Sequence, residues 1–192
     1  MDRSRFKLPD MKRPIDVAAQ QKLVMPGATV KGMQLQALAD ECKRRGRPLE
    51  RRKYQSFLDY PGEELVLVLA QAAALAWPDE PAREGLRRLG RVAYPTLKSS
   101  LIGRVVFGAV GADVRLLWPL VSKGYQLSAS RGQAELLELE ERQAVVRLND
   151  IFSFLDAWHV GILEGAMLAY GREAEVLFSP LLDISGDFLI RW

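Results

Sequence analysis

The chain has one histidine, His159, and it stands beside two glycines four residues apart, Gly161 and Gly165. A lone imidazole can hold a haem iron as its proximal ligand, and glycines on the same helix would leave room for a flat cofactor. The same residues suit a buried helix whose glycines let another element pack closely. Glycine costs about 1 kcal/mol relative to alanine inside a helix, so two on one face favour close packing. We therefore expect a packing role and keep Trp158, His159, Gly161 and Gly165 as a candidate ligand pocket.

Other catalytic and metal-binding patterns are weak in this sequence. A structural zinc site needs about four nitrogen or sulfur ligands, which one histidine and one cysteine cannot supply. Gly103, Gly108 and Gly111 lack the spacing of a phosphate-binding loop, and no G-x-S-x-G nucleophile motif occurs. Cys42 falls on a predicted helix as a buried, inert thiol. We expect no bound metal, no cofactor and no enzymatic activity.

A basic run lies between residues 43 and 53, where seven cations accompany one anion. Such a run can bind nucleic acid, an anionic lipid surface or an acidic protein, or it can be a solvated connector with local ion pairs. No motif of a sequence-specific DNA-binding protein accompanies it, so a protein is the partner we expect for it. The candidate partner-binding patch is Arg44, Arg45, Arg47, Arg51, Arg52 and Lys53.

The composition is that of an ordinary globular chain. Its 192 residues are 48% hydrophobic and 27% charged, which allows one domain with a substantial core. The longest apolar run, residues 65–77, is shorter than the about 20 residues that a transmembrane helix needs. One cysteine and no apolar N-terminal segment give no indication of secretion, so we expect a cytoplasmic location.

Proline, glycine and charge mark the predicted elements of the first half. Residues 1–13 are expected to form a flexible basic arm, and residues 14–192 a single α+β domain. Pro95 is expected to break the helix that begins after Pro81. The predicted helices cover, approximately, residues 15–23, 30–46, 61–77, 82–94, 95–108 and 113–121.

After residue 124 the apolar residues alternate, which is the period of a β-strand. Tyr125, Leu127 and Ala129 begin this pattern. Pro180 is expected to end a later strand, and residues 185–187 to form a turn. This order predicts an α+β fold: an N-terminal helical half packed with a four- to five-stranded antiparallel sheet, made of two hairpins separated by one helix. Further strands are predicted around residues 137–139, 144–148, 176–178 and 188–192, with the separating helix at 151–170.

Several short motifs are shared with a known family. They are Val30-Lys31-Gly32, Arg87-Arg88-Leu89-Gly90, Leu101-Ile102-Gly103-Arg104, Asn149-Asp150, Gly161-Ile162-Leu163-Glu164-Gly165 and Arg191-Trp192. With them the chain resembles an uncharacterised myxobacterial paralogous family over residues 15–192. That family is in turn similar to 4-vinyl-reductase-like domains, Bet3-type subunits of the TRAPP complex and haem nitric-oxide-binding domains. The resemblance implies helices packed on an antiparallel sheet, a ligand-sensing or scaffolding role and, for the first two relatives, dimerisation.

Two departures from the haem-binding relatives count against a haem in this chain. The resemblance implies a Tyr-x-Ser-x-Arg motif for the haem propionates, but Tyr125 is followed by Leu127 and Ala129 at those offsets. The haem-ligating histidine of those relatives also precedes the motif, whereas His159 follows Tyr125. Cys42 stands in a different local context from the acylated cysteine of the Bet3-type subunits.

Two hypotheses of function follow. The first is a non-catalytic, cytoplasmic regulatory or scaffold domain that binds a protein partner, gated by a small apolar ligand and forming a homodimer through its helical half. The alternative is a sensor of haem or another small molecule, with His159 and the glycine face in its pocket. An enzyme ranks below both.

Overall fold

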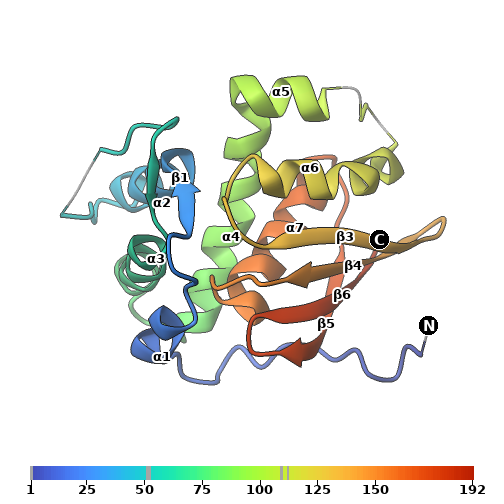
Figure 1. Cartoon of the computed structure of the whole chain (residues 1–192), viewed down its shortest axis with the longest axis horizontal. Coiled ribbons are helices and arrows are strands. Elements are labelled where there is room, and N and C mark those ends of the chain that lie inside the picture. The colour runs from blue at the N-terminus through green and yellow to red at the C-terminus, as the bar shows by residue number, and fades with distance from the viewer. Residues whose placement is uncertain (1, 51–52, 109, 112) are drawn as a thin grey trace.

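A group of helices lies beside an antiparallel sheet in the computed structural model of the chain (Figure 1). The structure describes residues 2–50, 53–108, 110–111 and 113–192. The elements are α1 (Val17–Lys22), β1 (Thr29–Lys31), α2 (Gly32–Arg44), β2 (Asp59–Pro61), α3 (Gly62–Ala76), α4 (Ala82–Ser99), α5 (Leu101–Phe107), the 3-10 helix η1 (Val114–Leu120), α6 (Val121–Gln126), β3 (Gln133–Leu139), β4 (Gln143–Asn149), the π-helix η2 (Leu155–His159), α7 (Val160–Leu168), β5 (Glu175–Leu182) and β6 (Ser185–Arg191).

The sheet has the strand order β3-β4-β6-β5, with every neighbouring pair antiparallel. Its two hairpins, β3–β4 and β5–β6, are separated in the chain by η2 and α7. The second strand of each hairpin lies in the middle of the sheet, where both pair along Val145–Leu189 and its neighbours. The α+β prediction of a helical half and two hairpins separated by one helix is confirmed.

Alternation along the strands gives the sheet two different faces. Val146 of β4 and Phe188 of β6 belong to a core that also contains α7 and η1 residues. Val145 and Leu189, one position along, point to the opposite face and pack with Phe6 near the N-terminus. The first face positions the site described below, because the helices cover it.

The segment before residue 14 contacts the outer face of the sheet. The backbone of Lys7 pairs with Phe178 of β5, with N–O distances of 3.0 and 2.8 Å. Phe6 is 6% exposed, and Arg5 forms an ion pair at 2.5 Å with Asp187, which is fully buried. These contacts place residues 5–7 on the sheet, while the flexibility expected of residues 1–13 stays a prediction.

Helix α4 joins the core of the helical half to the core beneath the sheet. Its residues Leu86 and Leu89 pack with α2 and α3, and Tyr94, further along, packs against Phe107 with ring centroids 5.7 Å apart. Helix α3 buries Leu65, Leu69 and Ala72 in the core of the helical half, while Leu67 and Leu75 on its other side are exposed. Within the described residues, no helix combines the length and hydropathy that a bilayer crossing requires.

The first predicted strand is wrong. Tyr125 lies in α6, the chain turns at residues 127–128, and Ala129 forms only an isolated β-bridge with Val30. The backbone of residues 128–130 bonds to β1, where the amide of Lys31 donates to the Ser128 carbonyl at 2.9 Å. The conformation of this segment is therefore set by hydrogen bonds to a strand that is distant in sequence, and the alternation of its apolar residues does not predict it.

The predicted effects of two prolines and the predicted position of one turn are also wrong. Pro95 lies inside α4, on its exposed side, where the loss of one helix hydrogen bond does not end the helix. Pro180 lies inside β5, which is an edge strand and tolerates a residue without an amide proton. The turn between β5 and β6 falls at residues 183–184, so Ser185 already begins β6.

Candidate functional site

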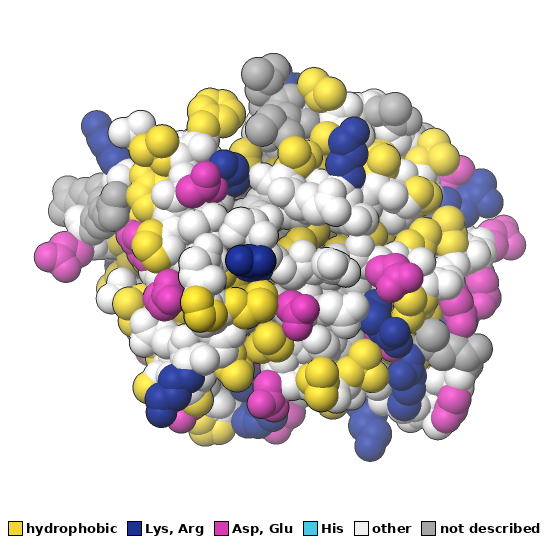
Figure 2. Space-filling view, viewed as in Figure 1, with side chains coloured by type: hydrophobic (Ala, Val, Ile, Leu, Met, Phe, Trp, Pro, Cys, Tyr) yellow, Lys and Arg dark blue, Asp and Glu magenta, His cyan; other side chains and the backbone are white. Residues whose placement is uncertain are grey.

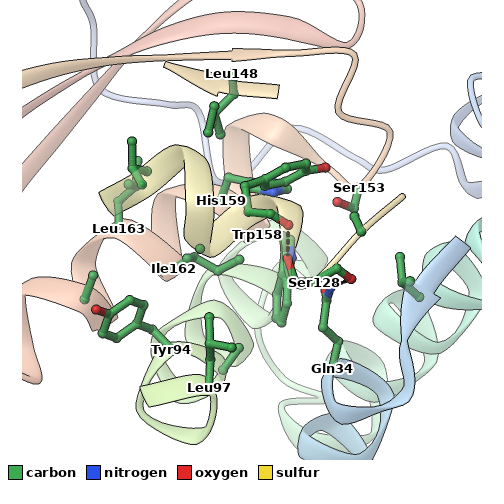
Figure 3. A pocket seen from close by; sticks show the side chains of 18 of the residues that line it. Gln34, Tyr94, Leu97, Ser128, Leu148, Ser153, Trp158, His159, Ile162 and Leu163 are labelled. Carbon is green, nitrogen blue, oxygen red and sulfur yellow. Dashed lines mark hydrogen bonds between the residues drawn. The ribbon is translucent and has the colours of Figure 1, made fainter. Parts of the chain in front are cut away.

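A cavity of about 120 Å³ lies between the helical half, α6 and the inner face of the sheet. Figure 3 shows Tyr94, Leu97, Ile162, Leu163 and Leu148 directed toward one space from α4, α7 and β4. None of the described residues that line it is Lys, Arg, Asp or Glu. The lining is Val30, Met33, Gln34, Leu65, Ala93, Tyr94, Thr96, Leu97, Phe107, Leu117, Trp118, Val121, Gly124, Tyr125, Ser128, Ala129, Ala134, Leu148, Phe152, Ser153, Trp158, His159, Ile162, Leu163 and Ala166.

An unusual backbone brings Trp158 and His159 to this cavity. Phe154 has a φ of +46°, a left-handed conformation that costs a bulky residue roughly 1–3 kcal/mol. It starts the π-helix η2, which ends at His159 and passes into α7. Single π-helical turns inside helices occur often at functional sites. The 151–170 helix predicted from sequence is therefore irregular where it meets the cavity.

His159 is buried and uncharged at neutral pH. The residue is 5% exposed, and burial lowers the pKa of its imidazole to about 4, with a hydrogen bond to the Ser153 backbone acting in the opposite direction. Its Nδ1 atom has no hydrogen-bond partner among the described residues. The imidazole is thus buried at the cavity wall, and one of its ring nitrogens has no hydrogen-bond partner among the described residues.

Two further aromatic side chains give the wall polar atoms that the sequence did not reveal. Trp118 is 1% exposed and stacks on Trp192, yet its indole Nε1 has no hydrogen-bond partner among the described residues. The ring of Tyr125 lies 6.5 Å from that of His159. Burial raises the pKa of the Tyr125 phenol, so it stays neutral. The described lining is therefore aromatic and aliphatic, with scattered uncharged polar atoms.

The two glycines of the candidate pocket lie elsewhere. Gly161 and Gly165 face α4, where a Cβ on Gly165 would lie 2.5 Å from the carbonyl oxygen of Arg91. Gly90 of α4 faces α7 in the same way, since a Cβ built on it would lie 2.7 Å from the Ile162 nitrogen. Of the four residues proposed from sequence, Trp158 and His159 line the cavity, while the glycines let α4 and α7 pack closely.

Ion pairs also connect α7 and η2 to α4. Glu164 of α7 is 4% exposed and accepts hydrogen bonds from Arg87 and Arg91 of α4, the latter at 2.6 Å. At the start of η2, Asp156 accepts from Arg83 of α4 and from Arg13. These pairs hold η2 and α7 against α4, and thus fix the segment that carries the cavity residues.

Three residues of the basic patch, Arg44, Arg45 and Arg47, make local contacts. Arg44 and Arg45 both donate to Glu41, which is 3% exposed, and these hydrogen bonds lower the pKa of Glu41 against the opposing effect of burial. The guanidinium of Arg45 also lies 3.9 Å from the Trp77 ring centroid, and Arg47 donates to the Leu75 carbonyl at 3.3 Å. Lys53 is exposed, and Arg51 and Arg52 lie outside the described residues. On the face shown in Figure 2, basic and acidic side chains are interspersed.

Neither a metal centre nor a reactive thiol is built by the described residues. No group of three or more His, Cys, Asp or Glu among them could hold a metal ion. Cys42 is fully buried, and burial raises the pKa of its thiol to about 11. Its Sγ lies 3.8 Å from the Ala72 carbonyl oxygen, as a donor. The cavity is thus the feature of the described structure best suited to a ligand.

Sequence reasoning missed most of the cavity wall. Tyr94, Phe107 and Trp118 come from segments that were predicted only as helices. They meet because α4, α5 and η1 contribute to one core that also contains residues of α7 and the sheet. Their apolar character is also that of ordinary core residues, so composition alone gives no signal. The unsatisfied Nε1 of Trp118 becomes visible only when its neighbours are known.

Solved structures of H-NOX proteins share this fold. An H-NOX domain from Shewanella oneidensis in the Fe(II)CO ligation state superposes with a TM-score of 0.64 at 16% identity, covering 84% of this chain and 97% of that one. A second structure from S. oneidensis, in the Fe(II)NO state, gives 0.62 at 16% identity, with 84% and 98% coverage. An Fe(II) unliganded variant from K. algicida gives 0.61 at 15% identity, with 84% and 95% coverage. The likeness shows the fold.

Sequence comparison gives the family. None of the curated proteins matches the chain. A family model described as "Protein of unknown function (DUF2378)" matches residues 23–192, which include every element from β1 to β6. The chain belongs to the DUF2378 family.

Proposed function

We propose that this chain is a small-molecule sensor domain that binds a small, neutral, largely apolar ligand without haem. The observation that carries the proposal is the cavity of about 120 Å³, whose described lining holds no charged side chain. A cavity of about 150 Å³ lined by aliphatic and aromatic side chains is large enough for benzene. The ligand class is therefore one of roughly that size.

The fold likeness supports the sensor hypothesis more than the scaffold hypothesis. The S. oneidensis and K. algicida proteins are H-NOX proteins studied as Fe(II), CO and NO states, and their architecture covers 84% of this chain. Architecture does not carry the ligand with it, since one fold serves many functions. The ligand has to be argued from the residues of this cavity.

A haem does not fit these residues. His159 could supply an axial nitrogen, but pockets for drug-sized ligands measure roughly 300–1,000 Å³, several times this cavity. A haem also brings two carboxylates, and a carboxylate in an apolar site needs a cation or several donors. No Lys or Arg among the described residues lines the cavity. The size and the uncharged lining of the cavity favour a smaller, neutral molecule.

Binding would be reported through α4. This helix carries Tyr94 and Leu97 on the cavity wall and Leu86 and Leu89 in the core of the helical half. A ligand that fits one arrangement of α4, α6 and the sheet better than another shifts the population toward it. In this proposal the output is a change in a non-catalytic contact with a protein partner or with a second copy of the chain in a cytoplasmic setting.

Isothermal titration calorimetry with toluene tests the proposal. We expect saturable one-to-one binding to the wild-type chain and its loss in Ala166→Leu, which adds side-chain volume at the cavity wall. Ala19→Leu on the exposed side of α1 is the matched control and keeps the binding. Haemin is titrated in parallel, and a saturable one-to-one haem complex that requires His159, with no toluene binding, refutes the proposal.

A further inference from the structure

We infer that the outer face of the sheet is a docking site for a peptide segment with the pattern Arg-x-Arg-aromatic, and that residues 3–7 of this chain occupy it in cis. The second occupant is a segment of a partner protein, which binds by displacing residues 3–7. The inference goes beyond the proposed function, because the cavity lies on the inner face of the sheet and this site lies on the outer face.

The apolar part of the site holds one aromatic ring. Phe6 is 6% exposed and packs on Val145 of β4, Leu177 of β5 and Leu189 of β6. Among residues 2–10, Phe6 is the one buried residue. A single buried aromatic side chain among more exposed contacts is the usual arrangement of a binding hot spot. Docking of the segment therefore depends mainly on this ring.

Acidic groups of the sheet face the arginines of the segment. Asp187 is fully buried and pairs with Arg5 at 2.5 Å, and Glu138 of β3 pairs with Arg3 at 2.6 Å. Complementary charge of this kind contributes specificity more than affinity. The site therefore selects a segment with two cations placed as in Arg-x-Arg.

The segment can leave without exposing an unpaired buried charge. Asp187 also accepts two hydrogen bonds from Arg147, at 2.7 and 3.0 Å, and these remain when Arg5 departs. Lys7 pairs with Phe178 of β5, an edge strand whose backbone groups water can reach once the segment is gone (Figure 1). Residues 3–7 also precede residues 23–192, which the family model matches. The segment is therefore a separable cover on the sheet.

The bound shape of the segment comes from its own residues. The amide of Ser4 donates to the Asp2 carboxylate at 2.9 Å, and the amide of Phe6 donates to the Arg3 carbonyl at 3.2 Å. Both bonds lie within residues 2–6, so a free peptide of the same sequence can form the same turn. The backbone pairing at Lys7 is the strand-addition mode of peptide recognition, which does not depend on the side chain of the added residue.

The test is a titration of a synthetic peptide with the sequence of residues 2–10 into the full-length Phe6→Ala chain, whose own segment is loosened. Methyl NMR is expected to show saturable shifts at Val145, Leu177 and Leu189, which surround the ring. The apparent affinity for the wild-type chain is expected to be about tenfold weaker, because the tethered segment competes for the site. Leu8→Ala is the matched control chain, and it should behave as the wild type because Leu8 is 69% exposed.

Two altered peptides test the recognition pattern. The peptide with Phe6→Ala is expected to lose binding, and the peptide with Arg5→Glu to bind roughly tenfold more weakly, since it places a carboxylate against Asp187. No saturable binding of the unaltered peptide to the Phe6→Ala chain overturns the inference. So does equal binding of all three peptides.

A further measurement uses the wild-type chain alone. Excess peptide is expected to quicken amide hydrogen exchange at Lys7 several-fold, because the displaced segment loses its bond to Phe178. Exchange at Lys7 that does not respond to a peptide that binds would show a different binding site and contradict the inference. A wild-type dimer that Phe6→Ala abolishes would assign the site to the segment of a second copy and overturn its assignment to a partner protein.

Discussion

A Cβ on Gly161 would lie 2.7 Å from the carbonyl carbon of Arg87 and would overlap the carbonyl oxygen. The backbones of α7 and α4 are therefore in direct contact, and only glycine permits this approach. With Gly165 and Gly90 placed in the same way, the contact extends along the helix pair. The close packing holds one side of α7 and leaves Leu163 and Ala166 to line the cavity.

Gly161→Ala is expected to destabilise the chain by about 3 kcal/mol, because the helices must separate to admit the methyl group. Urea unfolding followed by circular dichroism measures the loss. Gly171→Ala is the comparison: a Cβ there meets nothing within 4 Å, and only its φ of +70° opposes alanine, at a cost of about 1 kcal/mol. Equal losses in the two variants would contradict the close contact.

The sequence predicted the parts of the fold that local patterns determine. Pro61-Gly62 and Pro81 mark the starts of α3 and α4. The alternation of apolar and polar residues marks β3, β4 and β6. It also favoured packing for Gly161 and Gly165, which the contacts with α4 support. Each of these signals depends on residues close together in the chain.

What the sequence could not show depends on distant segments. Tyr125 was assigned to a strand, but backbone bonds from residues 128–130 to β1 set the turn that follows it. Trp118 and His159 share the cavity wall although 41 positions separate them in the printed sequence. The unsatisfied Nδ1 and Nε1 atoms are defined by neighbours that only folding supplies.

Stability is expected to fall on acidification because of His159. Its pKa is about 4 in the folded chain and near 6.5 in the unfolded chain, so the unfolded state binds the extra proton between these values. Stability is full above about pH 6.5, falls as the pH drops through this window by about 3 kcal/mol, and loses no more from this group below about pH 4. Urea midpoints across the window measure it.

His159→Gln is the control for this pH dependence. The variant keeps a neutral polar side chain and every carboxylate, so the difference between the two pH profiles isolates the single histidine. The account requires the slope between about pH 4.5 and 6.5 to be shallower in the variant. Parallel profiles would show that the imidazole is accessible to protons in the folded state.

Glu164→Gln is expected to lower stability by about 2 kcal/mol. The carboxylate is buried and bonds Arg87 and Arg91, while these arginine side chains keep 27% and 39% exposure, which reduces the cost of leaving them unpaired. Asp59→Asn removes the exposed pair with Lys31 and should change stability by no more than about 0.5 kcal/mol. Urea unfolding of both variants measures the two losses of stability. A loss in Glu164→Gln as small as that in Asp59→Asn would contradict the account.

Phe6→Ala is expected to loosen the N-terminal segment from the sheet. The ring packs on Val145, Leu177 and Leu189, and its loss removes about 2 kcal/mol of apolar burial. Amide hydrogen exchange should then quicken roughly 30-fold at Lys7, whose N–H donates to Phe178. Leu8→Ala is the control, since Leu8 is 69% exposed, and it should leave the exchange rate unchanged. Fast exchange at Lys7 already in the wild-type chain would show that the segment is detached.

The most direct test of the sensor account is a toluene titration followed by methyl NMR. The account predicts saturable shifts for methyl groups on the cavity wall, those of Ala134, Leu163 and Ala166, and none for Val145 and Leu177 on the outer face of the sheet. Shifts that grow linearly without saturation, or that are as large on the outer face as on the wall, would contradict it.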